Sequence, residues 1–194
     1  MEKNQLKPIE KVVILGGSAG SLEALLQILP ELKHIDSICI VIVLHRKNSD
    51  DNILEELLRM KSGLHVKEIE DKTTLKPGRI HVAPADYHLF FENDLTFSLD
   101  ISEKVHYSRP SIDVAFESAA YVLGEKLIAI LLSGANADGA AGLQTVKDTN
   151  GIVVIQSPET AEIAYMPEFA LSRVTTDYIL SPLDIAAFIN NLSD

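Results

Sequence analysis

Short apolar runs alternate along the chain with stretches in which leucines recur at helical spacing. Three continuous apolar runs, at residues 11–15, 38–44 and 127–133, predict strands that are buried on both faces of a sheet. Residues 21–29 carry leucines at helical spacing and are followed by Pro30, which stops a helix because it cannot donate a backbone hydrogen bond. The first strand, this helix and the second strand together have the form of a β-α-β unit.

The alternation continues through the rest of the chain. Helices are predicted at residues 52–60, 110–123, 140–147, 167–173 and 182–190, and further strands at 64–69, 152–156 and 178–180. Residues 79–99 differ, because three strand-like runs follow one another with tight connections and a turn at Asn93-Asp94, which predicts an antiparallel addition to the sheet. We therefore expect an α/β fold with a doubly wound, mostly parallel sheet, helices on both faces in a Rossmann-like three-layer arrangement, and an antiparallel β-hairpin.

Length and composition favour one globular domain. The chain has 194 residues, of which 46% are hydrophobic, enough for a substantial core. The polar residues 1–10 lack the apolar segment of a signal peptide, and no apolar run reaches the length that spans a bilayer. The single cysteine, Cys39, lies inside an apolar run, which excludes an internal disulfide and favours a reducing compartment. We expect a tail at residues 1–10, a single folded domain at residues 11–194 and a cytoplasmic location.

The net charge of −11 argues against two classes of partner. Nucleic-acid binding requires patches of Lys and Arg that neutralise phosphates, and binding to an anionic membrane surface has the same requirement. We therefore expect no nucleic-acid partner and no direct insertion into a membrane.

Polar side chains follow three of the predicted strands at the points where the strands end. Ser18 follows the first strand, His45 follows the second, and Asp138 lies in the segment after the strand at 127–133. Because the carboxyl ends of parallel strands meet at one edge of a sheet, we expect these side chains to lie close together. A serine, a histidine and an aspartate are the nucleophile, base and orienting group that acyl transfer needs. The sequence therefore predicts Ser18, His45 and Asp138 as catalytic residues.

The segment Gly16-Gly17-Ser18-Ala19-Gly20 fits the G-x-S-x-G pattern of a nucleophile on a sharp strand-to-helix turn. Backbone N–H groups at the start of the following helix can stabilise an oxyanion, which predicts a contribution from Ala19 and Gly20. A dinucleotide-binding loop is disfavoured, because serines stand at positions 18 and 21 where glycines are required. A role of Ser18 as a helix N-cap alone stays open, since serine is a preferred cap.

Two alternative kinds of site are disfavoured. An ordinary α/β-hydrolase has its histidine after the acid, whereas the last histidine here, His106, precedes Asp138. A triad is defined by geometry and not by order, so this difference does not count against catalysis. His81 and His88 could be two ligands of a metal, but no H-E-x-x-H pattern or cysteine pair accompanies them, and we expect no metal site.

Several motifs, in order, resemble those of one known family. They read VVILGGSAGSLEALLQILPEL, VLHRKNS, LKPGRIHVAPADYHL, SRPSIDVAFESAA, LLSGANADGAAGL and IQSPETAEIAYMPEFA, and the resemblance extends from about Val12 to Ile189. The chain resembles the catalytic domain of the CheB-type protein-glutamate methylesterases of bacterial chemotaxis. The resemblance implies that the catalytic serine, histidine and aspartate of the family fall on Ser18, His45 and Asp138. It also implies a mostly parallel, doubly wound sheet with a hairpin.

The resemblance further implies a reaction and a partner. A methyl-esterified glutamate on the cytoplasmic helices of a chemoreceptor is hydrolysed to glutamate and methanol, and some relatives also deamidate a receptor glutamine. The expected partner is therefore a methylated chemoreceptor (a methyl-accepting chemotaxis protein), and neither a metal nor an organic cofactor is implied. The alternative is a catalytically weak receptor-binding module of the same fold, against which the presence of all three catalytic residue types argues.

The chain departs from the family pattern in three places. Ser21 stands where a second glycine is usual, Arg46-Lys47 where Met-Pro is frequent, and Gly-Ala-Asn at 134–136 where Gly-Met-Gly is usual. The loss of the methionine removes bulk, so Ala135 is expected to line the site and to alter the fit of the substrate. Family members commonly carry an N-terminal receiver domain, whereas ten residues precede the first strand here. We expect either a stand-alone esterase or part of a longer chain, with any control by a regulator in trans.

Overall fold

The computed structural model describes residues 8–33, 35–46 and 53–193 of the chain. Residues 1–7 of the expected tail, Lys47 and the first residue of the helix expected at 52–60 lie outside these ranges. Among the helices that are described, none is both long enough and apolar enough to cross a membrane.

The described residues form two sheets. The strands are β1 (Lys11–Gly17), β2 (Ile38–Leu44), β3 (His65–Glu68), β4 (Arg79–Val82), β5 (His88–Phe91), β6 (Phe97–Asp100), β7 (Leu127–Leu131), β8 (Ile152–Gln156) and β9 (Tyr178–Leu180). The main sheet has seven strands in the order β3-β4-β2-β1-β7-β8-β9, with every neighbouring pair parallel, and β5 and β6 form a separate antiparallel pair. The first strand thus lies in the middle of the sheet, and the predicted doubly wound α/β fold with a hairpin is confirmed.

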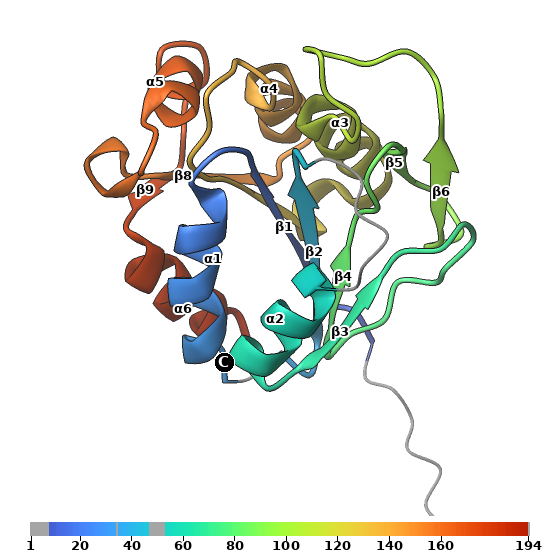
Figure 1. Ribbon diagram of the computed structural model, residues 1–194. Helices are drawn as coiled ribbons and strands as arrows, with labels where there is room; N and C mark the ends of the chain where they lie inside the picture. The colour runs from blue at the N-terminus through green and yellow to red at the C-terminus, as the bar shows by residue number, and fades with distance from the viewer. Residues whose placement is uncertain (1–7, 34, 47–52, 194) are drawn as a thin grey trace, which may run out of the picture.

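Helices cover both faces of the main sheet. They are α1 (Ser21–Ile28), α2 (Ile53–Ser62), α3 (Ile112–Leu123), α4 (Ala140–Asp148), α5 (Tyr165–Leu171) and α6 (Pro182–Asn190). Side chains that alternate along β1 enter two different cores: Val13 and Leu15 pack with α1, α2 and α6, whereas Val12 and Ile14 pack with α3, α4, α5 and the hairpin. Figure 1 shows α1 and α6 together on one side of the sheet and α3 and α4 on the other. Burial on both faces explains the continuous apolar runs of the central strands.

Strand β4 differs from the prediction for residues 79–99. It pairs in parallel with both β2 and β3 and lies inside the main sheet, so the expected antiparallel addition is limited to β5 and β6. The physical reason is burial, since Ile80 and Val82 of β4 join the core that α1, α2 and α6 cover. After β4 the chain leaves the sheet near Asp86, whose φ is +64°, and then forms the hairpin.

Three neighbouring strands lead to the predicted catalytic residues. β2, β1 and β7 are adjacent and parallel, so their carboxyl ends lie at one edge of the sheet. Gly17 pairs in register with Leu44, which makes Ser18 and His45 the next residues on adjacent strands. The loop after β7 brings Asp138 to the same edge, where α3 begins.

Candidate active site

Ser18 lies in the sharp turn between β1 and α1. Its N–H donates to the carbonyl oxygen of Ser133 at 2.9 Å, and its own carbonyl oxygen accepts the hydroxyl of Ser21 at 2.5 Å. Gly20 is the N-cap of α1 and has a φ of 78°, in the left-handed region that favours glycine. The helix is therefore not capped by Ser18, whose Oγ forms no hydrogen bond with any described residue. The hydroxyl is free to act on a substrate.

The His45 ring has a polar neighbour at each of its nitrogens. Nε2 lies 2.7 Å from Oδ2 of Asp138, whereas Nδ1 lies 3.2 Å from Oγ of Ser108 and 3.4 Å from Nδ2 of Asn136. Because an ionised carboxylate only accepts hydrogen bonds, we assign the ring proton to Nε2 and the free lone pair to Nδ1. Nδ1 is thus the nitrogen that can take a proton from a nucleophile.

Ser18 and His45 are held side by side by the pairing of their strands. The N–H of His45 donates to the carbonyl oxygen of Gly17 at 3.1 Å, which extends the pairing of β1 and β2 by one residue. Adjacent strands are about 4.8 Å apart, so Ser18 and His45 follow neighbouring strand ends. No hydrogen bond joins Ser18 and His45 in the described structure, where Ser108 is the hydroxyl that contacts Nδ1.

Asp138 is fully buried at the amino terminus of α3. Its Oδ1 accepts hydrogen bonds from Oγ of Ser111 at 2.9 Å and from the N–H of Asp113 at 3.0 Å, and its Oδ2 accepts the N–H of Ile112 at 2.7 Å. Burial raises the pKa of this carboxyl, but the hydrogen bonds from His45 and from the helix backbone outweigh burial, and the pKa lies below its usual value. The positive end of the helix dipole acts in the same direction. Asp138 is therefore ionised where it faces His45.

Ser111 connects the helix to the site. Its hydroxyl donates to Asp138 and also accepts the N–H of Val114 at 3.3 Å, as the N-cap of α3. Its own N–H donates to Nδ1 of His88 at 3.2 Å, and Nε2 of that ring lies 2.9 Å from the carbonyl oxygen of Glu103. His88 therefore ties the hairpin, the loop that follows it and the start of α3 together.

A second carboxylate, Asp113, lies behind Asp138. Its side chain is 7% exposed, its Oδ1 accepts the N–H of Gly142 at 2.7 Å, and its Oδ2 lies 3.3 Å from Nε2 of His106. Burial, together with the negative charge of Asp138, raises the pKa of Asp113 to about 6. The side chains of His106, Asp113 and Asp138 place ligand atoms within 4.8 Å of one another, but both oxygens of Asp138 already accept hydrogen bonds. We therefore interpret these side chains as part of the hydrogen-bond network around Asp138 and not as a metal centre.

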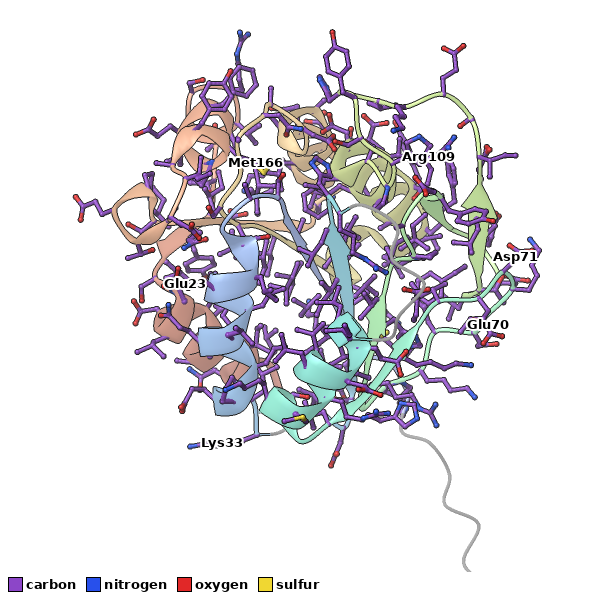
Figure 2. The ribbon with its side chains drawn as sticks, in the orientation of Figure 1. Glu23, Lys33, Glu70, Asp71, Arg109 and Met166 are labelled. Atoms are coloured by element: carbon purple, nitrogen blue, oxygen red, sulfur yellow. The ribbon has the colours of Figure 1, made fainter. Side chains whose placement is uncertain are left out.

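The residues predicted to stabilise an oxyanion or to line the site lie in the two loops at this edge. The N–H groups of Ala19, Gly20 and Ala135 have no hydrogen-bond acceptor among the described residues. Met166 of α5 packs against Gly134, where a Cβ would lie 2.6 Å from its sulfur. Figure 2 shows Met166 at this end of the sheet, so a methionine side chain borders the loop that carries Ala135.

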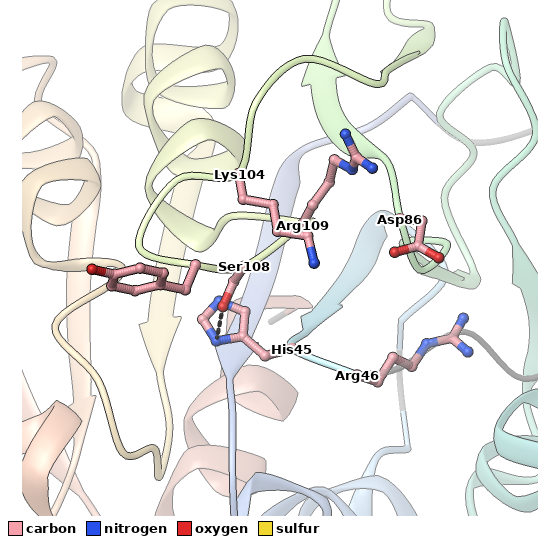
Figure 3. A pocket seen from close by; sticks show the side chains of 7 residues that line it. His45, Arg46, Asp86, Lys104, Ser108 and Arg109 are labelled. Atoms are coloured by element: carbon pink, nitrogen blue, oxygen red, sulfur yellow. Dashed lines mark hydrogen bonds between the residues drawn. The ribbon is translucent and has the colours of Figure 1, made fainter.

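A cavity of about 400 Å³ opens beside His45. Figure 3 shows its lining, which consists of His45, Arg46, Asp86, Lys104, Tyr107, Ser108 and Arg109. These residues come from the end of β2, from the turn before β5 and from the loop between β6 and α3. The cavity is therefore built largely by the segment that follows the hairpin.

The sequence analysis missed several polar residues around His45. Ser108 and Asn136 contact its Nδ1, and Ser111 holds Asp138. Ser111 had a local signal, because a serine follows a proline and precedes an acidic residue in the first turn of a predicted helix. For Ser108 no local pattern points to the site, because the contact depends on the course of the loop after the hairpin.

Comparisons with known proteins match most of this chain to one family. The family model for CheB methylesterase matches residues 13–189. A relative from Leptospira interrogans serogroup Icterohaemorrhagiae serovar copenhageni, named putative protein-glutamate methylesterase/protein-glutamine glutaminase, is 45% identical over 176 residues, which is 91% of this chain and 91% of that protein. A protein-glutamate methylesterase/protein-glutamine glutaminase from Thermotoga maritima is 34% identical over 88% of this chain and 50% of its own length. The crystal structure of the Thermotoga maritima CheB methylesterase catalytic domain matches with a TM-score of 0.88 and 33% identity, over 94% of this chain and 98% of that one.

Proposed function

This chain belongs to the CheB methylesterase family, and we propose that it is a protein-glutamate methylesterase of chemoreceptors in which Ser18, His45 and Asp138 are the catalytic residues. The observation that carries the proposal is the 2.7 Å hydrogen bond between His45 Nε2 and Asp138 Oδ2, at the sheet edge where Ser18 also lies. Such a pair holds an imidazole in the orientation and tautomer that a serine nucleophile needs.

Acylation starts with the Ser18 hydroxyl. Its Oγ attacks the carbonyl carbon of the glutamate methyl ester while Nδ1 of His45 takes the hydroxyl proton. The negative charge that develops on the carbonyl oxygen of the ester is stabilised by the N–H groups of Ala19 and Gly20. His45 then gives the proton to the methoxy oxygen, and methanol leaves an acyl group on Ser18. Asp138 stabilises the imidazolium by its charge and does not itself become protonated.

Deacylation repeats these steps with water as the nucleophile. The water attacks the acyl carbonyl, its proton passes to His45, and the collapse of the second intermediate returns that proton to Oγ of Ser18. The receptor side chain is released as glutamate. The same sequence applied to a glutamine side chain would release ammonia, and the names of the relatives support this glutaminase reaction as a second activity.

A second hydroxyl, that of Ser108, also lies near the base. We assign the nucleophile to Ser18 because it lies at the start of a helix, next to N–H groups without an acceptor. The N–H of Ser108 donates to the carbonyl oxygen of Val105 at 2.9 Å, so it has no free donor of its own for an oxyanion. Ser108 instead holds the ring by donating to Nδ1.

The experiment that tests the proposal compares two serine variants. Methanol release from a methyl-esterified chemoreceptor fragment should fall by several orders of magnitude in Ser18→Ala and remain within about tenfold of wild type in Ser108→Ala. A fluorophosphonate that labels activated serines should modify the peptide that contains Ser18 and not the peptide that contains Ser108. Near-normal turnover by Ser18→Ala would refute the assignment. Receptor binding without methanol release in the wild-type protein would favour the non-catalytic binding module.

A further inference from the structure

The cavity beside His45 is basic in a protein whose net charge is −11. Arg46, Lys104 and Arg109 line it, whereas Asp86 is the one acidic residue in the lining that the structure describes. A concentration of positive charge on an acidic protein, beside a reactive histidine, points to an anionic group on the molecule that reaches the site.

Much of this positive charge has no acidic partner in the part of the chain that the structure describes. Arg46 forms an ion pair with Glu68 through Nη2. Arg109 donates from Nη1 to two carbonyl oxygens of its own loop, at 2.5 and 2.7 Å, and no described acidic side chain forms an ion pair with Arg109 or Lys104. Asp86 likewise forms no ion pair with any described residue. It lowers the net positive charge of the cavity but occupies none of the N–H donors of Arg46, Lys104 or Arg109 through an ion pair.

The two arginines also leave donors unused. The Nε atoms of Arg46 and Arg109 are buried and have no hydrogen-bond partner among the described residues. An unpaired buried donor is unfavourable, so the protein does not fully satisfy the hydrogen-bonding capacity of these two guanidinium groups. In Arg109 the carbonyl contacts occupy Nη1, and Nη2 has no partner among the residues that the structure describes. A guanidinium N–H without a partner is well suited to a carboxylate oxygen.

The position of the cavity relates this group to the reaction. Figure 3 shows the Lys104 side chain extending into the opening between His45 on one side and Asp86 and Arg46 on the other. A substrate segment whose ester lies at His45 would therefore place a neighbouring side chain in the cavity. Demethylation itself turns an ester into a carboxylate, so a segment with more than one modifiable glutamate carries the group that the cavity fits.

We propose that this cavity is a carboxylate subsite, lined by Arg46, Lys104 and Arg109, that selects methyl esters flanked by a free acidic side chain. The inference rests on the proposed function, since it specifies the substrate of that same site. The subsite contacts the flanking residue and not the reacting atoms. It therefore contributes binding that is equal in the ground and transition states, which lowers KM and leaves kcat almost unchanged.

The test uses two peptides that differ by one charge. Each carries a single glutamate methyl ester, flanked by glutamate in one peptide and by glutamine in the other. The wild-type enzyme should hydrolyse the glutamate-flanked peptide with a kcat/KM about fivefold to tenfold higher, almost entirely through KM. The preference should decrease as ionic strength rises, because salt screens an exposed charge pair.

The variant Lys104→Gln should remove most of this preference, and Lys104→Glu should reverse it. Lys104 is exposed and forms no ion pair with a described residue, so neither change threatens the fold. The matched control is Lys126→Gln, an exposed lysine just before the amino end of β7 and so at the opposite edge of the sheet. It changes the net charge equally and should keep the wild-type preference.

A second measurement separates the subsite from the catalytic assignment. Binding of the same two peptides to the Ser18→Ala protein, followed by fluorescence anisotropy, should show the same charge preference without turnover. Equal binding of the two peptides, or a preference that survives in Lys104→Glu, would overturn the subsite. A preference in binding without hydrolysis by the wild-type enzyme would support the subsite and count against the proposed function instead.

Discussion

Asp113 offers a test of the electrostatics behind the site, because it is a buried carboxylate close to another one. Its pKa is raised to about 6, first by burial and then by the charge of Asp138. The substitution Asp113→Asn removes the charge and keeps the shape of the side chain. An asparagine oxygen can still accept the N–H of Gly142, which lies 2.7 Å from the present Oδ1.

The expected magnitude follows from the shift in pKa. The native protein holds the proton of Asp113 up to a pH of about 6, whereas the ordinary pKa of the group is 3.8, so the native state binds more protons than the unfolded state between these values. The free energy of unfolding of wild type therefore falls as the pH rises through this window. At about 1.4 kcal/mol for each pKa unit, ionised Asp113 destabilises the fold by about 3 kcal/mol above the window. Asp113→Asn should be more stable than wild type by about that amount at pH 8 and nearly equal to it at pH 4.

Urea unfolding followed by circular dichroism at about pH 4.5, 6 and 8 measures this difference. The matched control is Asp148→Asn, which removes an exposed carboxylate from α4 and should give a small difference at every pH. A stability difference between Asp113→Asn and wild type that is constant with pH would refute the reasoning. A stability difference that favours the variant more strongly in acid would also refute it, since that would mean that the Asp113 charge stabilises the fold.

Three further predictions concern single side chains. Ser111→Ala should lower the free energy of unfolding by about 2–3 kcal/mol in urea titrations, because it removes both the N-cap of α3 and a donor to buried Asp138. Gly20→Ala should abolish most esterase activity and lower the melting temperature, since its Cβ would lie 2.6 and 2.7 Å from two neighbouring side chains at a φ of 78°. Gly63→Ala, with a φ of 65° and open space around it, should retain activity and show only the cost of the positive φ, about 1 kcal/mol. Cys39, whose pKa burial raises to about 12, should react with a thiol reagent at pH 8 only after unfolding, and rapid modification of the native protein would contradict its buried position.

The strands that support the site could be predicted because each is a local pattern. Continuous apolar runs predicted β1, β2 and β7, and the rule that parallel strands share a carboxyl edge placed Ser18, His45 and Asp138 together. The structure agrees for the His45 and Asp138 pair and places Ser18 on the adjacent strand end. These inferences needed no knowledge of side-chain packing.

The rest of the site depends on contacts between distant segments. Ser108 reaches His45 across 63 positions in the sequence, and Ser111 reaches Asp138 across 27. Neither contact has a periodic signal, because both depend on how the hairpin directs the following loop over the sheet edge. The position of β4 was misjudged for a related reason, since a short apolar run between turns does not by itself distinguish a hairpin strand from a buried parallel one.

The glycines at this edge of the sheet also allow close packing, a role that the turn pattern alone does not indicate. Gly16 has an ordinary φ, yet a Cβ there would lie 2.6 Å from Cγ2 of Ile112 at the start of α3. Gly139, beside Asp138, would place a Cβ 3.1 Å from the same atom. The end of β1 and the loop after β7 therefore lack side chains where α3 approaches the sheet. Because the amino terminus of α3 supplies three of the hydrogen bonds that hold Asp138, and Asp138 orients His45, the close approach of this helix sets the geometry of the proposed catalytic base. The first glycine of the G-x-S-x-G pattern, Gly16, therefore affects the position of the proposed base as well as the turn that carries Ser18.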